Sequence, residues 1–266
     1  MKDTFRQILV ALTVFATIVV NILANALPLN GLNTGEISDR FKVYFVPAGY
    51  VFSIWGVIYI GLIAYAVYQA LPSQRENPRM RQTGYLVAAS GLVNILWLFL
   101  WHYEQFPLTL VAMFALLGLL IAIYLRLDIG KTSVQFVEAW AARVPFSIYL
   151  GWITVATVAN VTSILDFLNW DGFGLSPEIW MLIVLAAVLF IAALVSLTRR
   201  DVAYTLVILW ALVGIAVKHS GVIMVSTATL VTAALIAFVL IYSLVRQRIV
   251  KGKANEKAVT IRSDMV

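Results

Sequence analysis

About eight long apolar runs constrain what this chain can fold into more than any other feature of its sequence. Each approaches the roughly 20 residues that a helix needs to cross a bilayer. The runs cover residues 5–27, 46–71, 84–102, 107–127, 140–168, 178–198, 202–218 and 222–245. The seventh is short, which fits a partial span or a span beside a tilted neighbour, and Pro145 predicts a bend early in the fifth. The pattern predicts an all-α integral membrane protein with about eight transmembrane helices.

The composition supports the same class of protein. Hydrophobic residues make up 62% of the chain and charged residues 12%, whereas soluble domains contain about 25% charged residues. There are too few polar side chains to cover a surface that faces water, so lipid is the expected partner. The net charge of +6 does not indicate nucleic acid, because the basic residues lie in loops and in the tail. The absence of cysteine and the wide separation of His102 and His219 argue against a metal site.

The distribution of Lys and Arg tests the number of spans. With eight spans and a cytoplasmic N-terminus, 16 of the 19 Lys and Arg residues fall on the cytoplasmic side, and only Arg40, Lys42 and Lys218 lie outside. This bias follows the positive-inside rule, and one missed span would invert everything after it. We expect cytoplasmic N- and C-termini in a bacterial-type inner membrane, with residues 246–266 as a basic cytoplasmic tail. A cleaved signal peptide is the alternative for the first run, because residues 24–26 resemble a cleavage site.

Polar residues within the apolar runs are costly in lipid and therefore need an explanation. The candidates are Asn21, Asn25, Asn94, Thr154, Thr157 and Asn160. Asn21 lies roughly 9 Å below the outer end of its predicted helix. Three further residues lie roughly 12–13 Å deep: Trp55, Asn94 and Asn160. This shared depth predicts the floor of a cavity open to the outer side, and hydrogen bonds that only hold helices together are the alternative.

Aromatic residues converge on the same depth. Phe52, Trp55 and Tyr59 have the spacing of one helix face. Trp97 and Trp152 also lie too deep for the aromatic belt at the membrane surface, and a buried indole needs a partner for its N–H group. The tryptophans at the ends of the runs are expected in that belt: Trp101, Trp140, Trp170 and Trp180.

Three short motifs resemble the TspO/MBR family, the tryptophan-rich sensory proteins related to the mitochondrial translocator protein. The first is the segment 46–59, where Pro47 leads into Phe52 and then into Trp55 and Tyr59. The second is Asn94 followed by Trp97, and the third is the series Trp152, Ala156 and Asn160. The second proline of the family's pair is Ala48 here, and the spacing of Phe52 and Pro145 also departs from the family pattern. The resemblance covers about residues 1–170, the size of the family's five-helix bundle.

The resemblance implies a TspO-like five-helix core over residues 1–170. Residues 171–245 would add three transmembrane helices, which we expect to pack outside the core and to contribute little to its pocket. The implied ligands are hydrophobic and planar, such as porphyrins and other tetrapyrroles, without a resident cofactor, and a homodimer remains open. The candidate ligand-binding residues are Asn21, Phe52, Trp55, Tyr59, Asn94, Trp97, Trp152 and Asn160.

Two other function classes compete with a membrane sensor or binding protein. An equilibrative transporter of a small organic molecule is the alternative, but the runs contain no charged residue near their centres, which disfavours ion-coupled transport. An enzyme is not expected, because the runs lack a Ser-His pair and paired carboxylates at bilayer depth. Asp166, Asp171 and Glu178 lie close together in sequence, and a solvated loop explains them better than a catalytic site.

Overall fold

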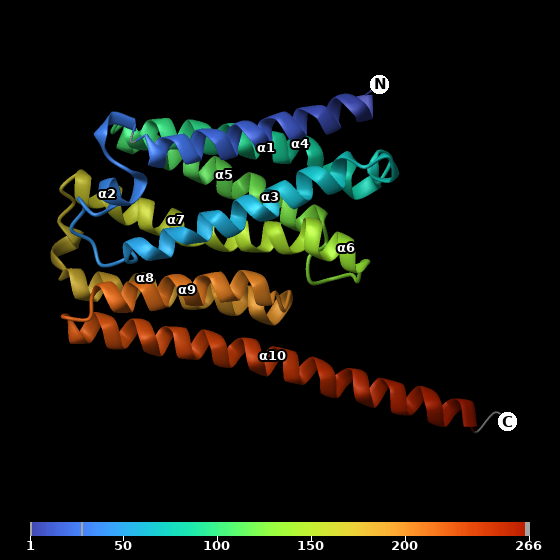
Figure 1. The fold of residues 1–266 in the computed structure, drawn as a ribbon. Coiled ribbons are helices and arrows are strands. Elements are labelled where there is room, and N and C mark those ends of the chain that lie inside the picture. The colour runs from blue at the N-terminus through green and yellow to red at the C-terminus, as the bar shows by residue number, and fades with distance from the viewer. Residues whose placement is uncertain (1, 28, 264–266) are drawn as a thin grey trace.

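The structure is a computed structural model that describes residues 2–27 and 29–263, and every regular element in this part of the chain is a helix (Figure 1). The long helices are α1 (Lys2–Ala26), α3 (Ile54–Ala70), α4 (Pro78–His102), α5 (Phe106–Arg126), α7 (Val144–Phe167), α8 (Pro177–Thr198), α9 (Val202–Lys218) and α10 (Ile223–Ser263). Short elements join them: η1 (Leu29–Gly31), α2 (Thr34–Ser38), η2 (Gly49–Ser53), η3 (Pro72–Gln74), α6 (Phe136–Glu138), η4 (Ala139–Arg143) and η5 (Gly172–Gly174). The all-α multi-span fold expected from the sequence is confirmed.

Seven of the helical segments are long and apolar enough to cross a membrane, and α9, with 17 residues, is the shorter apolar helix. The start of α1 lies at the same end of the bundle as the α3–α4, α5–α7 and α8–α9 connections, and α2 lies at the opposite end (Figure 1). The basic tail was predicted for residues 246–266. Its first residues belong to α10, which ends at Ser263, and residues 264–266 lie outside the described part of the chain.

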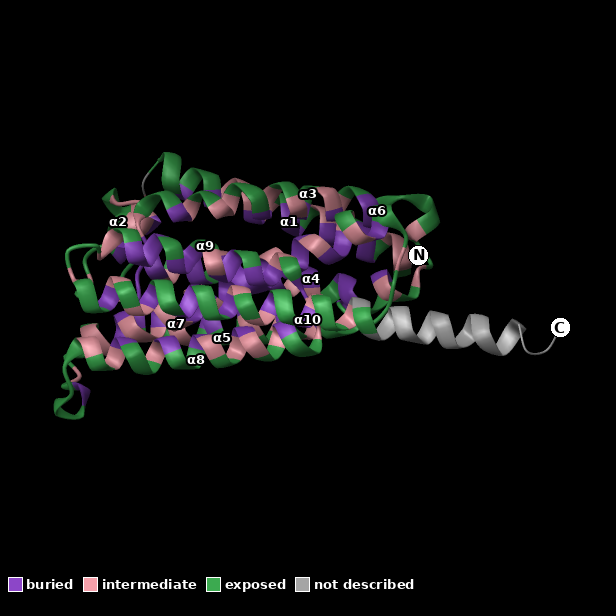
Figure 2. Ribbon diagram, turned by 90° about the horizontal axis from the view of Figure 1, so that it is seen from below, coloured by how far each residue is buried: buried purple, intermediate pink, exposed green. Residues whose placement is uncertain are grey.

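The helix contacts form a closed ring in the order α1, α4, α5, α7 and α3, with α3 packing back onto α1. Buried residues face the interior of the bundle, whereas exposed residues cover its outward faces (Figure 2). Many exposed residues are large and apolar, such as Phe15, Ile60 and Phe190. An apolar exterior of this extent suits contact with lipid chains.

The last three helices form a layer beside this ring. Of these, α9 packs against α7, and α10 packs against α8 and α9. The α7–α9 interface is close, because a Cβ atom added at Gly151 would lie 2.9 Å from the Tyr204 carbonyl oxygen. Ser147 donates a 2.6 Å hydrogen bond to the buried Asp201 carboxylate, and the Tyr204 hydroxyl donates to Thr154. Such interhelical hydrogen bonds between small and polar residues are typical of membrane bundles.

The interruption expected near Pro145 is a turn of π-helix. The turn η4 immediately precedes α7, and Pro145 is the second residue of α7. Proline cannot donate a backbone hydrogen bond, so the preceding turn widens to i+5 pairing instead of continuing as α-helix. Gly61 of α3 makes room for the ring, since a Cβ atom there would lie 2.9 Å from Pro145 Cβ. The irregularity therefore lies next to a close contact between α3 and α7.

Candidate functional site

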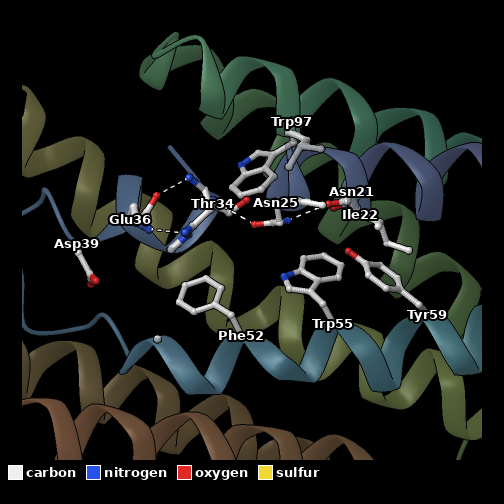
Figure 3. Close-up of a pocket in the computed structure, with 15 residues that line it drawn as sticks. Asn21, Ile22, Asn25, Thr34, Glu36, Asp39, Phe52, Trp55, Tyr59 and Trp97 are labelled. Carbon is white, nitrogen blue, oxygen red and sulfur yellow. Dashed lines mark hydrogen bonds between the residues drawn. The ribbon is translucent and has the colours of Figure 1, made fainter. Parts of the chain in front are cut away.

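A pocket of about 650 Å³ lies toward the end of the bundle that carries α2 (Figure 3). Its walls come from α1, α4, the segment η2–α3 and the α2 region. A volume of this size is typical of small-molecule sites. The lining residues are Asn21, Ile22, Asn25, Ala26, Asn33, Thr34, Gly35, Glu36, Asp39, Gly49, Phe52, Trp55, Tyr59, Trp97 and Leu98.

Aromatic rings line two sides of this pocket. Phe52, Trp55 and Tyr59 follow one another along one wall, and Trp97 projects from the other side (Figure 3). The rings of Trp55 and Tyr59 stack with their centroids 5.7 Å apart and their planes 26° apart. The spacing that placed these three residues on one helix face therefore produces a continuous wall. Apolar, flat surfaces facing each other across a pocket suit a planar ligand.

Two of the asparagines expected at one depth, Asn21 and Asn94, meet between α1 and α4. Asn21 donates a 2.8 Å hydrogen bond to Asn94 Oδ1 and a second one to the Thr17 carbonyl oxygen. Asn21 lines the pocket, whereas Asn94, which is only 1% exposed, lies behind it. The pair thus joins two helices and also presents one polar side chain to the pocket.

A second, much smaller void of about 40 Å³ lies next to the pocket. The two spaces share four lining residues: Thr34, Phe52, Trp55 and Trp97. Asn94 and Trp152 line only the smaller void. The Trp152 ring makes edge contacts with Phe52 and Trp55, and its buried Nε1–H donates to no described residue. The partner that a buried indole N–H group needs is therefore absent for Trp152 among the described residues.

Asn160 does not line either space, and this corrects its place in the predicted site. Asn160 belongs to α7 and bonds to two neighbouring helices. Its Nδ2 donates a 3.0 Å hydrogen bond to Thr109 Oγ1 on α5, and its Oδ1 accepts a 3.4 Å hydrogen bond from Trp97 Nε1 on α4. Thr109 is fully buried in this contact. Asn160 thus orients Trp97 from behind while Trp97 faces the pocket.

The α2 region forms one wall of the pocket and supplies half of the lining residues that the candidate set lacked. Asn33 caps α2 by accepting from Gly35 N and Glu36 N, while Glu36 accepts from Asn33 N. This capping box is readable in sequence as an asparagine followed three residues later by glutamate. The segment then packs on α4, because Trp101 Nε1 donates 3.2 Å to the Thr34 carbonyl oxygen and Thr34 Oγ1 pairs with His102.

Trp101 was expected in the aromatic belt, and this prediction is wrong. Its side chain is 4% exposed and stacks on Trp97 at 5.4 Å and 18° between planes. Its other face meets Phe41 and Phe106. A tryptophan at the end of a helix can face either lipid or a loop that covers it. Trp101 is covered by the segment that contains Thr34 and Phe41.

The three acidic residues that lie close together in sequence, Asp166, Asp171 and Glu178, do not form one site. Each accepts a hydrogen bond from a different partner. Asp166 accepts one from the Lys42 backbone N–H, Asp171 from the Phe173 backbone N–H, and Glu178 a 2.8 Å bond from the Tyr44 hydroxyl. The hydrogen bond to Glu178 raises the pKa of Tyr44. In the described part of the chain no group of acidic, histidine or cysteine side chains could hold a metal ion.

None of the described side chains of α8, α9 or α10 lines the pocket, but α9 contacts the segment η2, which does line it. Trp210 Nε1 donates 3.2 Å to the Val51 carbonyl oxygen, and Ala48 N donates 3.2 Å to the Gly214 carbonyl oxygen. Tyr50 meets the edge of Trp210 with centroids 5.4 Å apart. These contacts fix η2, which carries Phe52 and leads directly into Trp55.

Comparison with known sequences places this architecture. Neither a curated protein nor a solved structure matches the chain. A family model described as TSPO-like protein matches residues 7–242, which includes the pocket and also the helices after residue 170. This chain, a multi-pass integral membrane protein, therefore belongs to the TSPO-like protein family.

Proposed function

We propose that the protein binds hydrophobic, planar ligands of the porphyrin or tetrapyrrole kind in the pocket beneath α2 and acts as a membrane sensor. The observation that carries the proposal is the pair of aromatic walls, with Trp97 on one side and Phe52, Trp55 and Tyr59 on the other. Membership of the TSPO-like family supports ligand binding or sensing in a membrane. The proposal needs binding and no catalytic step.

Tryptophan fluorescence tests this proposal directly, because Trp55 and Trp97 line the pocket. The purified protein, in lipid nanodiscs, is titrated with protoporphyrin and in parallel with its dimethyl ester. We expect saturable quenching by protoporphyrin, by its dimethyl ester or by both. The reference is the quenching of free tryptophan mixed with empty nanodiscs. Quenching that never saturates with either ring would contradict a defined planar-ligand site.

The orientation in the membrane is part of the same proposal. We propose that the α2 end faces outward and that both termini are cytoplasmic, because the opposite end carries most of the Lys and Arg residues. Reporter fusions at Gly130 and Val266, the latter outside the described residues, should give cytoplasmic signals. A fusion at Gly172 should give an external signal, and a cytoplasmic signal there would overturn the orientation.

A further inference from the structure

The charge of the pocket lining is one-sided. Among the described lining residues, Glu36 and Asp39 are acidic and none is Lys or Arg. Both acidic residues come from the α2 region at one side of the pocket, whereas Tyr59 and Ile22 lie toward the other (Figure 3). The connections at this end of the bundle carry four acidic residues and only two basic ones. An anionic group entering here meets like charge, and a cationic group meets opposite charge.

The carboxylates of Glu36 and Asp39 differ in whether a positively charged side chain lies beside them. Asp39 forms an ion pair with Lys218, the last residue of α9. Glu36 accepts a hydrogen bond from Asn33 N and forms no ion pair within the described residues. Glu36 is therefore the lining residue whose negative charge has no cation beside it.

The aromatic walls favour the same sign of charge. The face of a tryptophan or tyrosine ring is negative, so a cation within about 6 Å of its centre is attracted, and more strongly where water is excluded. Trp97 is only 8% exposed, and Trp55 and Tyr59 are stacked beside the same space. Rings of this kind around a cation form the usual recognition site for quaternary ammonium groups.

A third observation shows that the inner end of the site has an unused polar group. Trp152 is 3% exposed, lines the inner void, and its Nε1–H has no acceptor among the described residues. A buried donor without a partner is costly, and an acceptor on a ligand that extends inward past Phe52 would satisfy it. The site thus offers a hydrogen-bond donor at its inner end and a carboxylate at its mouth.

From these contacts we propose that the pocket selects planar aromatic ligands that carry a positive charge at the edge facing α2, and disfavours anionic ones. The inference rests on the proposed function, and it adds a charge preference that a hydrophobic pocket alone would not have. The charge sits between the aromatic walls and Glu36, and the ring extends toward Trp152.

Three naphthalenes that share one ring and one methylene linker test this preference. They are (2-naphthylmethyl)trimethylammonium, its carbon isostere 2-neopentylnaphthalene and the anion 2-naphthylacetate. Each is measured by equilibrium dialysis against the full-length protein in phosphatidylcholine nanodiscs, with empty nanodiscs subtracted for partitioning into lipid. The cation is expected to bind about fivefold or more tightly than its neutral isostere, and the anion more weakly than both.

A matched pair of variants locates the charge. Glu36→Gln removes the charge and keeps the capping hydrogen bond, since glutamine also serves at that position. It should reduce the advantage of the cation over the neutral isostere about threefold or more. The neutral compound should bind as it does to the natural protein. Asp171→Asn removes one charge from the same end of the bundle, outside the pocket, and should change nothing. Equal effects of the two variants, or an anion that binds as tightly as the cation, would overturn the charge preference.

The result also separates this inference from the proposed function. If protoporphyrin dimethyl ester binds saturably but the cation has no advantage over its isostere, the charge preference is wrong and the planar-ligand site stands. If neither the ester nor any naphthalene binds above empty nanodiscs, both proposals are wrong.

Discussion

The first seven helices and the last three are similarly apolar but use their polar residues differently. In the first region, side chains bond across helices, as in the Asn21–Asn94 pair and the contact of Asn160 with Thr109. The spans of the last region contain no asparagine or glutamine up to residue 245. Their polar groups are mainly hydroxyls, and several of these return to their own helix, as Thr229 does to Val225 and Thr232 to Ala228. Side chains that bond back to the same helix satisfy themselves without specifying a neighbour.

This difference separates the building of a pocket from its support. The first region supplies every lining residue of the pocket and the inner void. The last region reaches the site only through α9, whose Trp210 and Gly214 bond η2 from outside. We infer that the first region determines what binds and that α9 determines how firmly one aromatic wall is held.

The largest effect expected is the loss of a wall residue in the first region. Trp55→Ala removes the ring that borders both spaces and stacks on Tyr59. Aromatic anchors often contribute about 2 kcal/mol or more, so affinity for a planar ligand should fall more than tenfold. Titration of the purified variant with protoporphyrin dimethyl ester measures the change.

Trp180→Ala is the control from the last region. Trp180 packs on Trp170 and donates to the Gly172 carbonyl oxygen, away from the pocket lining, so its removal should leave affinity unchanged. Equal losses from Trp55→Ala and Trp180→Ala would mean that the pocket is assigned to the wrong region.

A smaller effect is expected where the two regions meet. A Cβ atom at Gly214 would lie 2.1 Å from Val51 Cγ2, and Val51 is fully buried. Gly214→Ala should therefore displace η2, lower the stability by about 1–3 kcal/mol and weaken ligand binding several-fold, although residue 214 does not line the pocket. Thermal unfolding and ligand titration in the same detergent measure both quantities.

The double variant Gly214→Ala/Val51→Ala removes the colliding methyl group and should recover most of the lost affinity. Gly118→Ala on α5 is the matched control, because no atom lies within 4 Å of the added Cβ. If Gly214→Ala binds ligand as the natural protein does, α9 does not support the pocket.

The sequence predicted the elements of this fold well because lipid imposes a simple requirement. A span needs a long apolar run, and a run of this length is visible without tertiary information. The face formed by Phe52, Trp55 and Tyr59 was also predictable, since residues spaced three and four apart share one side of a helix. These features depend on local sequence alone.

The remainder depended on contacts between distant segments. Whether Trp101 faces lipid or the α2 region is decided by where residues 29–53 fold back, and their sequence has no periodicity that specifies this. Asn160 and Asn94 share a depth with the site, but depth does not say whether a side chain points into a pocket or toward the next helix. The support from α9 likewise depends on Gly214 meeting Val51 across more than 160 residues of chain.

The smallest effect concerns the hydrogen bond between α1 and α4, and a double-mutant cycle isolates it. Hydrogen bonds between membrane helices average about 0.6 kcal/mol and reach about 1.7 kcal/mol, so Asn21→Leu and Asn94→Leu should show a coupling energy in that range. Asn94→Leu alone should be mild, because the Asn21 amide still donates to the Thr17 carbonyl oxygen.

Ligand binding should separate the same two variants. Asn21 lines the pocket and Asn94 lines only the inner void, so Asn21→Leu should change affinity for a planar ligand more than Asn94→Leu does. Reversible unfolding in mixed micelles gives the coupling energy, and titration gives the affinities. A coupling energy near zero would mean that the pair does not hold α1 on α4. A larger loss of affinity from Asn94→Leu would show that the ligand reaches the inner void, where the free N–H of Trp152 also lies.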